Sequence, residues 1–167
     1  VALLAHGRPE VRVSVARALG NIGDVGLWSA KEQRAKIVTP RLVDLLDDGD
    51  WNVRWEAASA LGKIRPSVKE AVPSLIRLLQ DREPVRSTAA RSIIGIGPEA
   101  EPDIAAVATL LRQGNGVGEA AADVLRNLGP DAQLKAIPTI NDLLCDTNAA
   151  VRNAAAAAMI KVAPAVE

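Results

Sequence analysis

Few side chains in this sequence could carry out acid–base or nucleophilic chemistry. His6 is the only histidine and Cys145 the only cysteine among 167 residues. A nucleophile needs a neighbouring base, and a zinc site needs several nitrogen or sulfur ligands. One histidine and one cysteine supply neither, and no glycine loop of the phosphate-binding type is present. We therefore expect no enzyme activity, no metal and no cofactor.

The tryptophans carry a different chemistry, that of recognition. Trp28, Trp51 and Trp55 are the only aromatic residues of the chain, and the last two flank Arg54. Tryptophan beside arginine is typical of interaction hot spots, because an indole buries a large area and attracts cations. Which elements position these residues is therefore the first structural question.

A repeated segment supplies the answer. Five copies of it start 42, 32, 32 and 34 residues apart, at Val11, Val53, Val85, Val117 and Val151. Apolar residues occupy positions 1, 5, 6, 9 and 12 of each copy, which is the spacing of a helix and not of a strand. A proline follows four of the copies and indicates where the helix stops. The copies are Val11–Gly23, Val53–Arg65, Val85–Gly97, Val117–Gly129 and Val151–Ala163.

A second helical pattern precedes each copy, marked by a Leu-Leu or Leu-Leu-like pair seven or eight residues earlier. Pro40, Pro73 and Pro138 are expected to start or kink three of these helices. A two-helix unit cannot bury its apolar face alone, whereas stacked units share one core. We predict an all-α, right-handed α-solenoid of about ten helices in one domain. Its units are about 1–23 (truncated), 24–65, 66–97, 98–129 and 130–163.

The pattern V-R-x-x-A-A-x-x-L-x-x-I after a Leu-Leu-x-Asp helix resembles HEAT repeats, specifically the bacterial HEAT-like repeats named after phycobilisome lyases. The resemblance covers essentially the whole chain. It implies a scaffold that binds another protein or peptide on a concave surface lined by the second helices, as part of a larger signalling or regulatory protein. A bilin lyase-type or chaperone-like subunit is the alternative.

The resemblance also implies a ladder of ion pairs, in which an aspartate at the end of the first helix pairs with the arginine at the start of the second. The matching residues are Asp48 with Arg54, Asp81 with Arg86, and Asp146 with Arg152. The fourth copy has Gly118 in place of the arginine, so we expect the ladder to be broken there. The alternative is an anion site built from Arg12, Arg54 and Arg86.

Positions 3, 4, 7, 10 and 11 of each copy lie opposite the apolar stripe, so they should line the concave surface. Trp55 occupies position 3, where the other copies have Val13, Ser87, Glu119 and Asn153. We predict that Trp55 is an exposed anchor between Arg17 and Arg91, with Trp51 one turn earlier. The expected polar rim is Glu56, Ser59, Lys63, Ser87 and Thr88. The alternative is that Trp55 fills a groove and has only a structural role.

Charge and hydropathy limit the classes of partner. The sequence has 20 basic and 20 acidic residues, whereas a duplex-binding module usually has a clear basic excess. Nucleic acid is therefore an unlikely partner, although some HEAT-like proteins are DNA glycosylases with concave Trp and Asp residues. Here Asp123 lies two repeats from Trp55. No apolar run of about 18 residues and no signal peptide is evident, so we expect a cytoplasmic protein. The resemblance to bacterial HEAT-like repeats implies that it is a bacterial one.

Three further expectations concern the first repeat and the ends. The excess residues 24–35 contain Ser29 and Glu32 at capping-box spacing, so they should extend the first helix or add a short turn before it. The chain opens at Val1 without methionine, which we interpret as the start of a segment of a longer protein. The last helix has no evident polar cap, so weak end-to-end self-association is expected.

Overall fold

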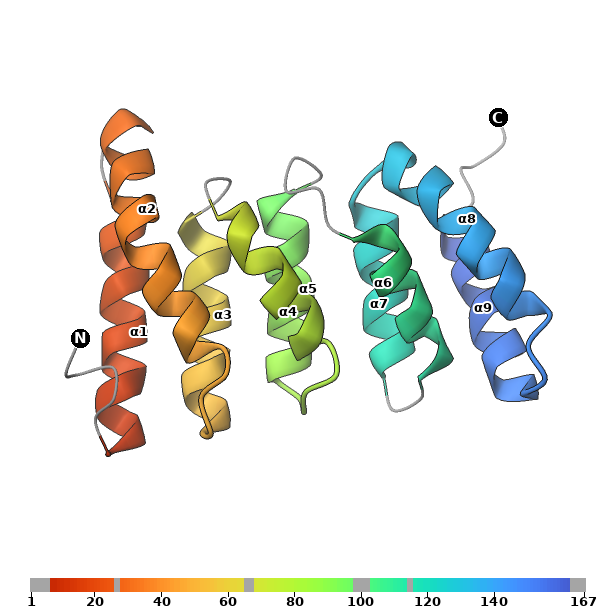
Figure 1. Cartoon of the computed structure of the whole chain (residues 1–167), viewed down its shortest axis with the longest axis horizontal. Coiled ribbons are helices and arrows are strands. Elements are labelled where there is room, and N and C mark those ends of the chain that lie inside the picture. Colours follow the sequence, from red (N-terminus) through yellow and green to blue (C-terminus); the bar gives the residue numbers. More distant parts are fainter. Residues whose placement is uncertain (1–6, 26–27, 65–67, 98–102, 114–115, 163–167) are drawn as a thin grey trace. The chain divides into compact units, whose positions relative to one another are not determined.

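The computed structural model describes residues 7–25, 28–64, 68–97, 103–113 and 116–162, which form nine α-helices and no strand (Figure 1). The all-α fold and the arrangement in two-helix repeats are confirmed. Of the ten predicted helices, the one marked by Leu3 and Leu4 lies outside the described residues. The chain divides into two compact units, residues 1–100 and 101–167.

The first unit holds two full repeats and the second helix of the preceding one. Its helices are α1 (Pro9–Asp24), α2 (Trp28–Leu45), α3 (Trp51–Ile64), α4 (Val72–Leu78, after a 3-10 turn at Lys69–Ala71) and α5 (Val85–Ile96). The second helices α1, α3 and α5 pack side by side, while α2 packs against α1 and α3, and α4 packs against α5. The result is two layers, with the second helices forming one of them.

The second unit repeats this arrangement. Its helices are α6 (Ile104–Thr109, continued by a 3-10 turn at Leu110–Arg112), α7 (Val117–Asn127), α8 (Pro130–Leu144) and α9 (Ala149–Val162). The second helices α7 and α9 pack on each other, and α6 and α8 form the other layer. The five sequence copies therefore correspond to α1, α3, α5, α7 and α9.

The proline-containing first helices differ from one another. Pro73 is the second residue of α4, where a missing amide hydrogen costs nothing. Pro40 and Pro138 lie inside α2 and α8, which continue through them. The extra residues of the first repeat lengthen α2, which has 18 residues and already includes Trp28 and Ser29. They therefore extend the first helix, and Ser29 does not precede it as a cap.

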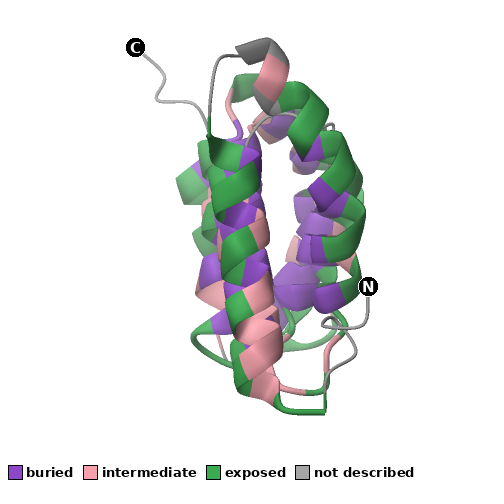
Figure 2. Cartoon of the chain, turned by 90° about the vertical axis from the view of Figure 1, so that its left-hand side faces the viewer, coloured by how far each residue is buried: buried purple, intermediate pink, exposed green. Residues whose placement is uncertain are grey.

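The core lies between the two layers of helices. On α3 it consists of Val53, Ala57, Leu61 and Ile64, none of which is exposed to solvent. Figure 2 shows the buried residues gathered on the facing sides of the helices, with exposed residues on the outer sides. These residues occupy the predicted apolar positions, so burial of the repeat's apolar stripe is what holds each helix pair together.

Neighbouring second helices approach each other closely through small residues. A Cβ atom on Gly20 would lie 2.7 Å from Cβ of Ala60, and one on Gly62 would lie 2.6 Å from Oγ of Ser92. Both glycines are at position 10 of their copies, and both partners are at position 8 of the next copy. A larger residue at position 10 would push α1 from α3, or α3 from α5.

This side-by-side packing makes the exposed stripe of each second helix narrower than predicted. Glu56 and Thr88 at position 4 were expected at an exposed rim, but both are buried. Ala60 and Ser92 at position 8 are buried as well. The reason is that α3 and α5 each have a preceding helix on this flank, which the periodicity of a single helix cannot reveal.

Candidate functional site

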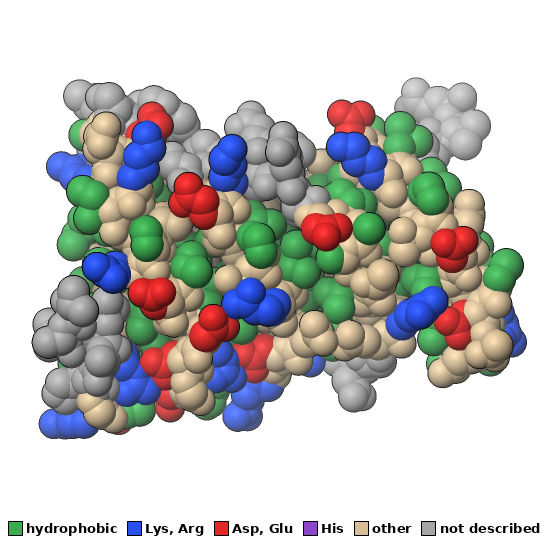
Figure 3. Space-filling view, viewed as in Figure 1, with side chains coloured by type: hydrophobic (Ala, Val, Ile, Leu, Met, Phe, Trp, Pro, Cys, Tyr) green, Lys and Arg blue, Asp and Glu red, His purple; other side chains and the backbone are tan. Residues whose placement is uncertain are grey.

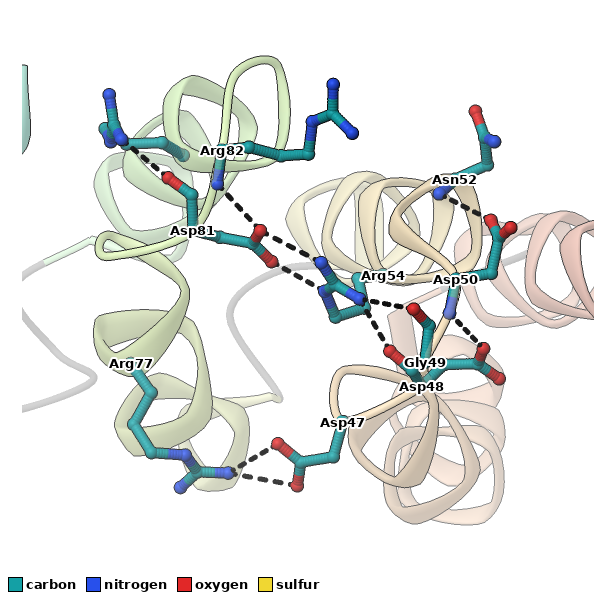
Figure 4. Close-up of polar contacts among 10 residues, drawn as sticks. Asp47, Asp48, Gly49, Asp50, Asn52, Arg54, Arg77, Asp81 and Arg82 are labelled. Atoms are coloured by element: carbon teal, nitrogen blue, oxygen red, sulfur yellow. Dashed lines mark hydrogen bonds and ion pairs between the residues drawn. The ribbon is translucent and has the colours of Figure 1, made fainter.

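The turns between helices carry ion pairs that join consecutive repeats (Figure 4). Arg12 on α1 donates from Nε and Nη2 to the two carboxylate oxygens of Asp48, at 2.6 and 2.8 Å. Arg54 on α3 does the same to Asp81, at 2.6 and 2.9 Å. Each arginine thus binds the aspartate of the next repeat. Two parallel bonds fix direction as well as distance, so the pairs hold the repeats in register.

The pairing within a repeat differs from the prediction. Arg54 does not bind the Asp48 carboxylate; its Nη1 donates to the main-chain oxygens of Asp48 and Gly49, at 2.7 and 3.2 Å. Arg86 likewise donates to the main-chain oxygen of Asp81 at 2.7 Å, and Arg152 to that of Asp146 at 2.8 Å. The arginine closes its own turn through carbonyl groups, which leaves the aspartate side chain for the preceding repeat.

Two of the ladder aspartates, Asp48 and Asp81, are held in the charged state. Burial by itself would raise the pKa of Asp48, but hydrogen bonds from Arg12 and the Asp50 amide outweigh it and lower the pKa below 3.8. The pKa of Asp81 is lowered in the same way, by Arg54 and the Arg82 amide. Since Arg12 and Arg54 are engaged by these carboxylates, the alternative of an anion site on them is not supported.

The fourth repeat compensates for its missing arginine. A Cβ atom at Gly118 would lie 2.9 Å from the main-chain oxygen of Gln113, so the backbone of α7 lies close to the preceding turn. Arg112, which ends the 3-10 turn, has its Nη2 3.6 Å from Oδ2 of Asp146. An arginine from a different position therefore contacts the aspartate of the fifth repeat.

Trp51 belongs to the turn region and not to the surface of Trp55. The guanidinium carbon of Arg82 lies over the Trp51 ring, 5.1 Å from its centroid. This is a cation–π contact between the start of α3 and the turn before α5. The predicted role of Trp51 beside Trp55 is thus replaced by a contact between repeats.

The main candidate site is a groove between α1 and α3, which we call the Trp groove. Its volume is about 450 Å³, and Trp55 is half-buried in its wall. Its lining residues come from the N-terminal half of α1 and from the start of α3 with the residue before it: Pro9, Glu10, Val13, Ser14, Arg17, Asp50, Asn52, Trp55 and Glu56. Of these, only Trp55, Arg17 and Glu56 were predicted. Pro9, Glu10, Asp50 and Asn52 precede their copies, where position arguments give no signal. Val13 and Ser14 occupy positions 3 and 4 of the first copy, so the predicted surface stripe could have identified them.

Arg17 lies in the Trp groove as predicted, but it is bound to Glu56. Its Nε and Nη2 are 3.3 and 2.9 Å from the carboxylate oxygens, and the Glu56 side chain is 5% exposed. The hydrogen bond and the charge of Glu56 raise the pKa of Arg17. Arg17 therefore neutralises a buried carboxylate and is not a free anchor beside the indole.

Arg91 lies in a second, smaller groove between α3 and α5, which we call the hydroxyl groove. Its volume is about 250 Å³, and it is lined by Ser59, Gly62, Thr88, Arg91, Ser92 and Gly95. Arg91 donates to Oγ1 of Thr88 at 3.1 Å, and Ser92 donates to the main-chain oxygen of Ala58 at 2.8 Å. The predicted Trp55 cluster is thus divided between two grooves. The predicted rim residues Lys63 and Ser87 line neither of them.

The second unit has a groove of about 230 Å³ between α7 and α9, lined mainly by alanine and glycine. Next to it, Nζ of Lys161 lies 3.2 Å from Oδ1 of Asp123, and Arg126 lies 3.8 Å from the same oxygen. Asp123 is therefore held in ion pairs, and Trp55 belongs to the other unit. This arrangement gives no support to a glycosylase-like Trp–Asp pair.

Charged side chains of both signs alternate near the turns of the first unit, at the lower left of Figure 3. Within the described ranges, no group of three or more His, Cys, Asp or Glu residues is placed to hold a metal ion. Cys145 is exposed and is not in a disulfide. None of the helices described is both long and apolar enough to span a bilayer.

Two-helix repeats with stacked second helices define the class of α-solenoid repeat proteins. The sequence matches the family model for HEAT repeats over residues 1–94 and 39–125, and the chain belongs to this family. No curated protein sequence matches the chain.

Solved structures agree with this assignment. An engineered protein is 26% identical and covers 97% of this chain and 78% of its own, with a TM-score of 0.62. The complex of CpcE and CpcF of phycocyanin lyase from Nostoc sp. is 28% identical, with a TM-score of 0.57, and the match covers 97% of this chain but 63% of that one. A designed armadillo repeat protein in complex with the peptide (KR)4 is 24% identical, covers 96% of this chain and 79% of its own, and has a TM-score of 0.60; it shows the fold alone.

Proposed function

We propose that this protein is a non-enzymatic interaction scaffold that binds an extended segment of a partner protein across its second helices. The observation that carries the proposal is the Trp groove. Trp55 is half-buried in a groove of about 450 Å³, at a position where no other copy has an aromatic residue. The other repeats fold without an aromatic residue at this position, so folding of the repeat does not require one. A large aromatic side chain beside a groove is typical of a binding anchor.

Two further grooves are consistent with binding along the second helices. The Trp groove, the hydroxyl groove and the groove of the second unit all lie between consecutive second helices. Side chains from these helices line all three. Within the first unit, an extended peptide that crosses α1, α3 and α5 would place its side chains into the Trp groove and the hydroxyl groove in turn.

The test is peptide binding to wild-type protein and to single variants. We would measure fluorescence anisotropy with pools of labelled nine-residue peptides. Loss of a desolvated indole costs about 2 kcal/mol or more, which is about 30-fold in Kd. We expect Trp55→Ala to weaken the best pool by about this factor and Lys63→Ala, an exposed change on the same helix outside both grooves, to leave it unchanged. Equal binding by wild type and Trp55→Ala would refute the proposal.

A lyase-type role is the second candidate, because the phycocyanin lyase complex is similar over 97% of this chain. A protein with this role should bind a free bilin. Incubation with a bilin followed by an absorbance scan tests this directly. A shifted absorption band that is lost in Trp55→Ala would favour this role over a peptide scaffold.

A further inference from the structure

We propose that the Trp groove takes a basic side chain of the partner, an arginine or lysine that lies against Trp55 between Glu10 and Asp50. This inference rests on the proposed scaffold function and names the chemistry of its ligand. Two observations support it: the excess of negative charge among the residues that line the groove, and the indole ring of Trp55 in its wall.

The charges of the groove do not cancel. Its lining includes the carboxylates of Glu10, Asp50 and Glu56 but a single cation, Arg17. Arg17 is bound to Glu56 through both carboxylate oxygens, so this pair is neutral. Glu10 and Asp50 remain. The pKa of nearby Arg12 is raised chiefly by its hydrogen bond to Asp48, with smaller contributions from the charges of Asp50 and Glu10. The residues that line the groove therefore carry two excess negative charges.

The remaining carboxylates are well placed for a ligand. Glu10 is exposed in the first turn of α1, and Asp50 is half-buried just before α3. The Asp50 carboxylate is oriented by the main-chain N–H of Asn52, which donates to Oδ1 at 2.8 Å. A carboxylate fixed in this way loses little further entropy when a cation binds.

The indole favours the same ligand. Tryptophan is the aromatic residue that attracts cations most strongly through its ring face. In this protein Arg82 already uses the ring of Trp51 in this manner, at 5.1 Å. Among the described residues, no cation lies over Trp55. A guanidinium or ammonium group in the Trp groove would combine a ring contact with two carboxylates, whereas an acidic side chain would be repelled.

The hydroxyl groove on the other side of α3 has the opposite character. Arg91 is exposed there among serine and threonine side chains, and no carboxylate lines this groove. Adjacent helices pack about 8–10 Å apart, and an extended peptide advances about 3.3 Å per residue. The hydroxyl groove is also centred about six residues, or about 9 Å, further along the helices than the Trp groove. A peptide with its basic residue in the Trp groove therefore places a residue about four positions away beside Arg91, where an acidic side chain is favoured.

The experiment uses the nine-residue pools with the central residue fixed as Arg, Lys, Glu or Leu, measured in low and moderate salt. We expect the Arg and Lys pools to bind at least about tenfold more tightly than the Glu pool, and this preference to decrease in salt. The double variant Glu10→Gln/Asp50→Asn removes both charges and keeps the shapes; asparagine also remains a good helix cap. It should lose the preference, while Asp131→Asn/Asp142→Asn on α8 should retain it.

A second library tests the spacing, with arginine fixed at the centre and glutamate moved along the peptide. Binding should be strongest with glutamate about four positions from the arginine, and Arg91→Gln should remove this optimum. A flat profile would refute the second part of the inference.

The outcomes separate this inference from the scaffold proposal. If Leu or Glu pools bind best and depend on Trp55, the scaffold stands and the basic ligand is wrong. If the double variant keeps the preference for basic pools, the groove carboxylates are not the cause and the inference is again wrong. If no pool shows binding that depends on Trp55, both proposals are wrong.

Discussion

Arg17 on α1 and Glu56 on α3 form a two-point ion pair across the helix interface, with Nε–Oε1 and Nη2–Oε2 distances of 3.3 and 2.9 Å. The pair is asymmetric: the glutamate side chain is 5% exposed and the arginine side chain 58%. A buried carboxylate that loses its cation is strongly destabilising, whereas its replacement by a neutral group is tolerated better. The two residues should therefore respond differently to substitution.

The first prediction follows from this asymmetry. Arg17→Ala leaves the Glu56 carboxylate buried without a cation, so we expect it to lower the melting temperature clearly more than Glu56→Gln does. The double variant Arg17→Ala/Glu56→Gln should recover most of the loss. Arg91→Ala, which removes an exposed arginine with one hydrogen bond to Thr88, is the control. If Arg17→Ala is no worse than this control, the pair has no structural role.

The second prediction concerns pH. A carboxylate whose pKa is lowered in the folded state stabilises the protein above the pKa of the unfolded chain, about 3.9, and this contribution is lost as pH falls through the folded pKa. Asp48 is such a group. Denaturation with urea from pH 7 to pH 3 should show that the free energy of unfolding of wild type falls more steeply below about pH 4 than that of Asp48→Asn. Parallel curves would contradict the lowered pKa.

The third prediction distinguishes an anchor from a core residue at position 55. Trp55 is half-buried, whereas Leu61 on the same helix is fully buried. We expect Trp55→Ala to cost about 1 kcal/mol in unfolding free energy, against about 2–5 kcal/mol for Leu61→Ala. Thermal or urea denaturation measures both. A loss near 3 kcal/mol for Trp55→Ala would identify a groove-filling structural residue.

The fourth prediction tests the close approach of α1 and α3. Glycine to alanine inside a helix normally stabilises by about 1 kcal/mol. At Gly20 we expect the opposite sign, because the new Cβ would lie 2.7 Å from Cβ of Ala60. Adding Ala60→Gly should relieve the clash, so the double variant should be more stable than the sum of the single changes implies. Urea denaturation of the four proteins gives the coupling energy.

The fifth prediction concerns self-association. Ile160 on α9 is 81% exposed and occupies position 10 of its copy, where Gly20 and Gly62 contact the next second helix. If a second copy covers this face, Ile160→Lys should weaken association in sedimentation experiments at about millimolar concentration without lowering the melting temperature. Wild type that stays monomeric at that concentration would contradict the expectation.

The periodicity of the five copies was sufficient to predict the helices and most of the core, because positions 1, 5, 6, 9 and 12 face the other layer. The exceptions are in the first and last copies, where Ile22 at position 12 and Ala156 at position 6 are exposed. It also placed Trp55 outside the core. It could not show that Glu56 and Thr88 are buried, since this depends on the neighbouring second helix and not on the pattern of one helix.

The ladder was mispredicted for a related reason. The resemblance to HEAT-like repeats implied that Asp48 pairs with Arg54, six residues later. The carboxylate instead binds Arg12, 36 residues earlier, because stacking brings the turn of one repeat beside the second helix of the preceding one. Likewise, Arg91 and Trp55 belong to neighbouring repeats but line opposite flanks of α3. The position of a residue in the sequence shows which repeat it belongs to. Which neighbouring helix it contacts depends on how the repeats pack on one another.

The position of the ladder also indicates where this chain tolerates insertions. The ion pairs of Asp48 and Asp81 lie at the ends where α2 and α4 lead into α3 and α5. The helix α2 has 18 residues and α4 has seven, and the additional residues of α2 lie at its opposite end, from Trp28 onward. The first helix of a repeat can therefore vary in length at its N-terminal end, while the ion pairs keep the distance between repeats constant at its C-terminal end. New sequence, whether acquired in evolution or grafted by design, should be accommodated best at the junction between α1 and α2.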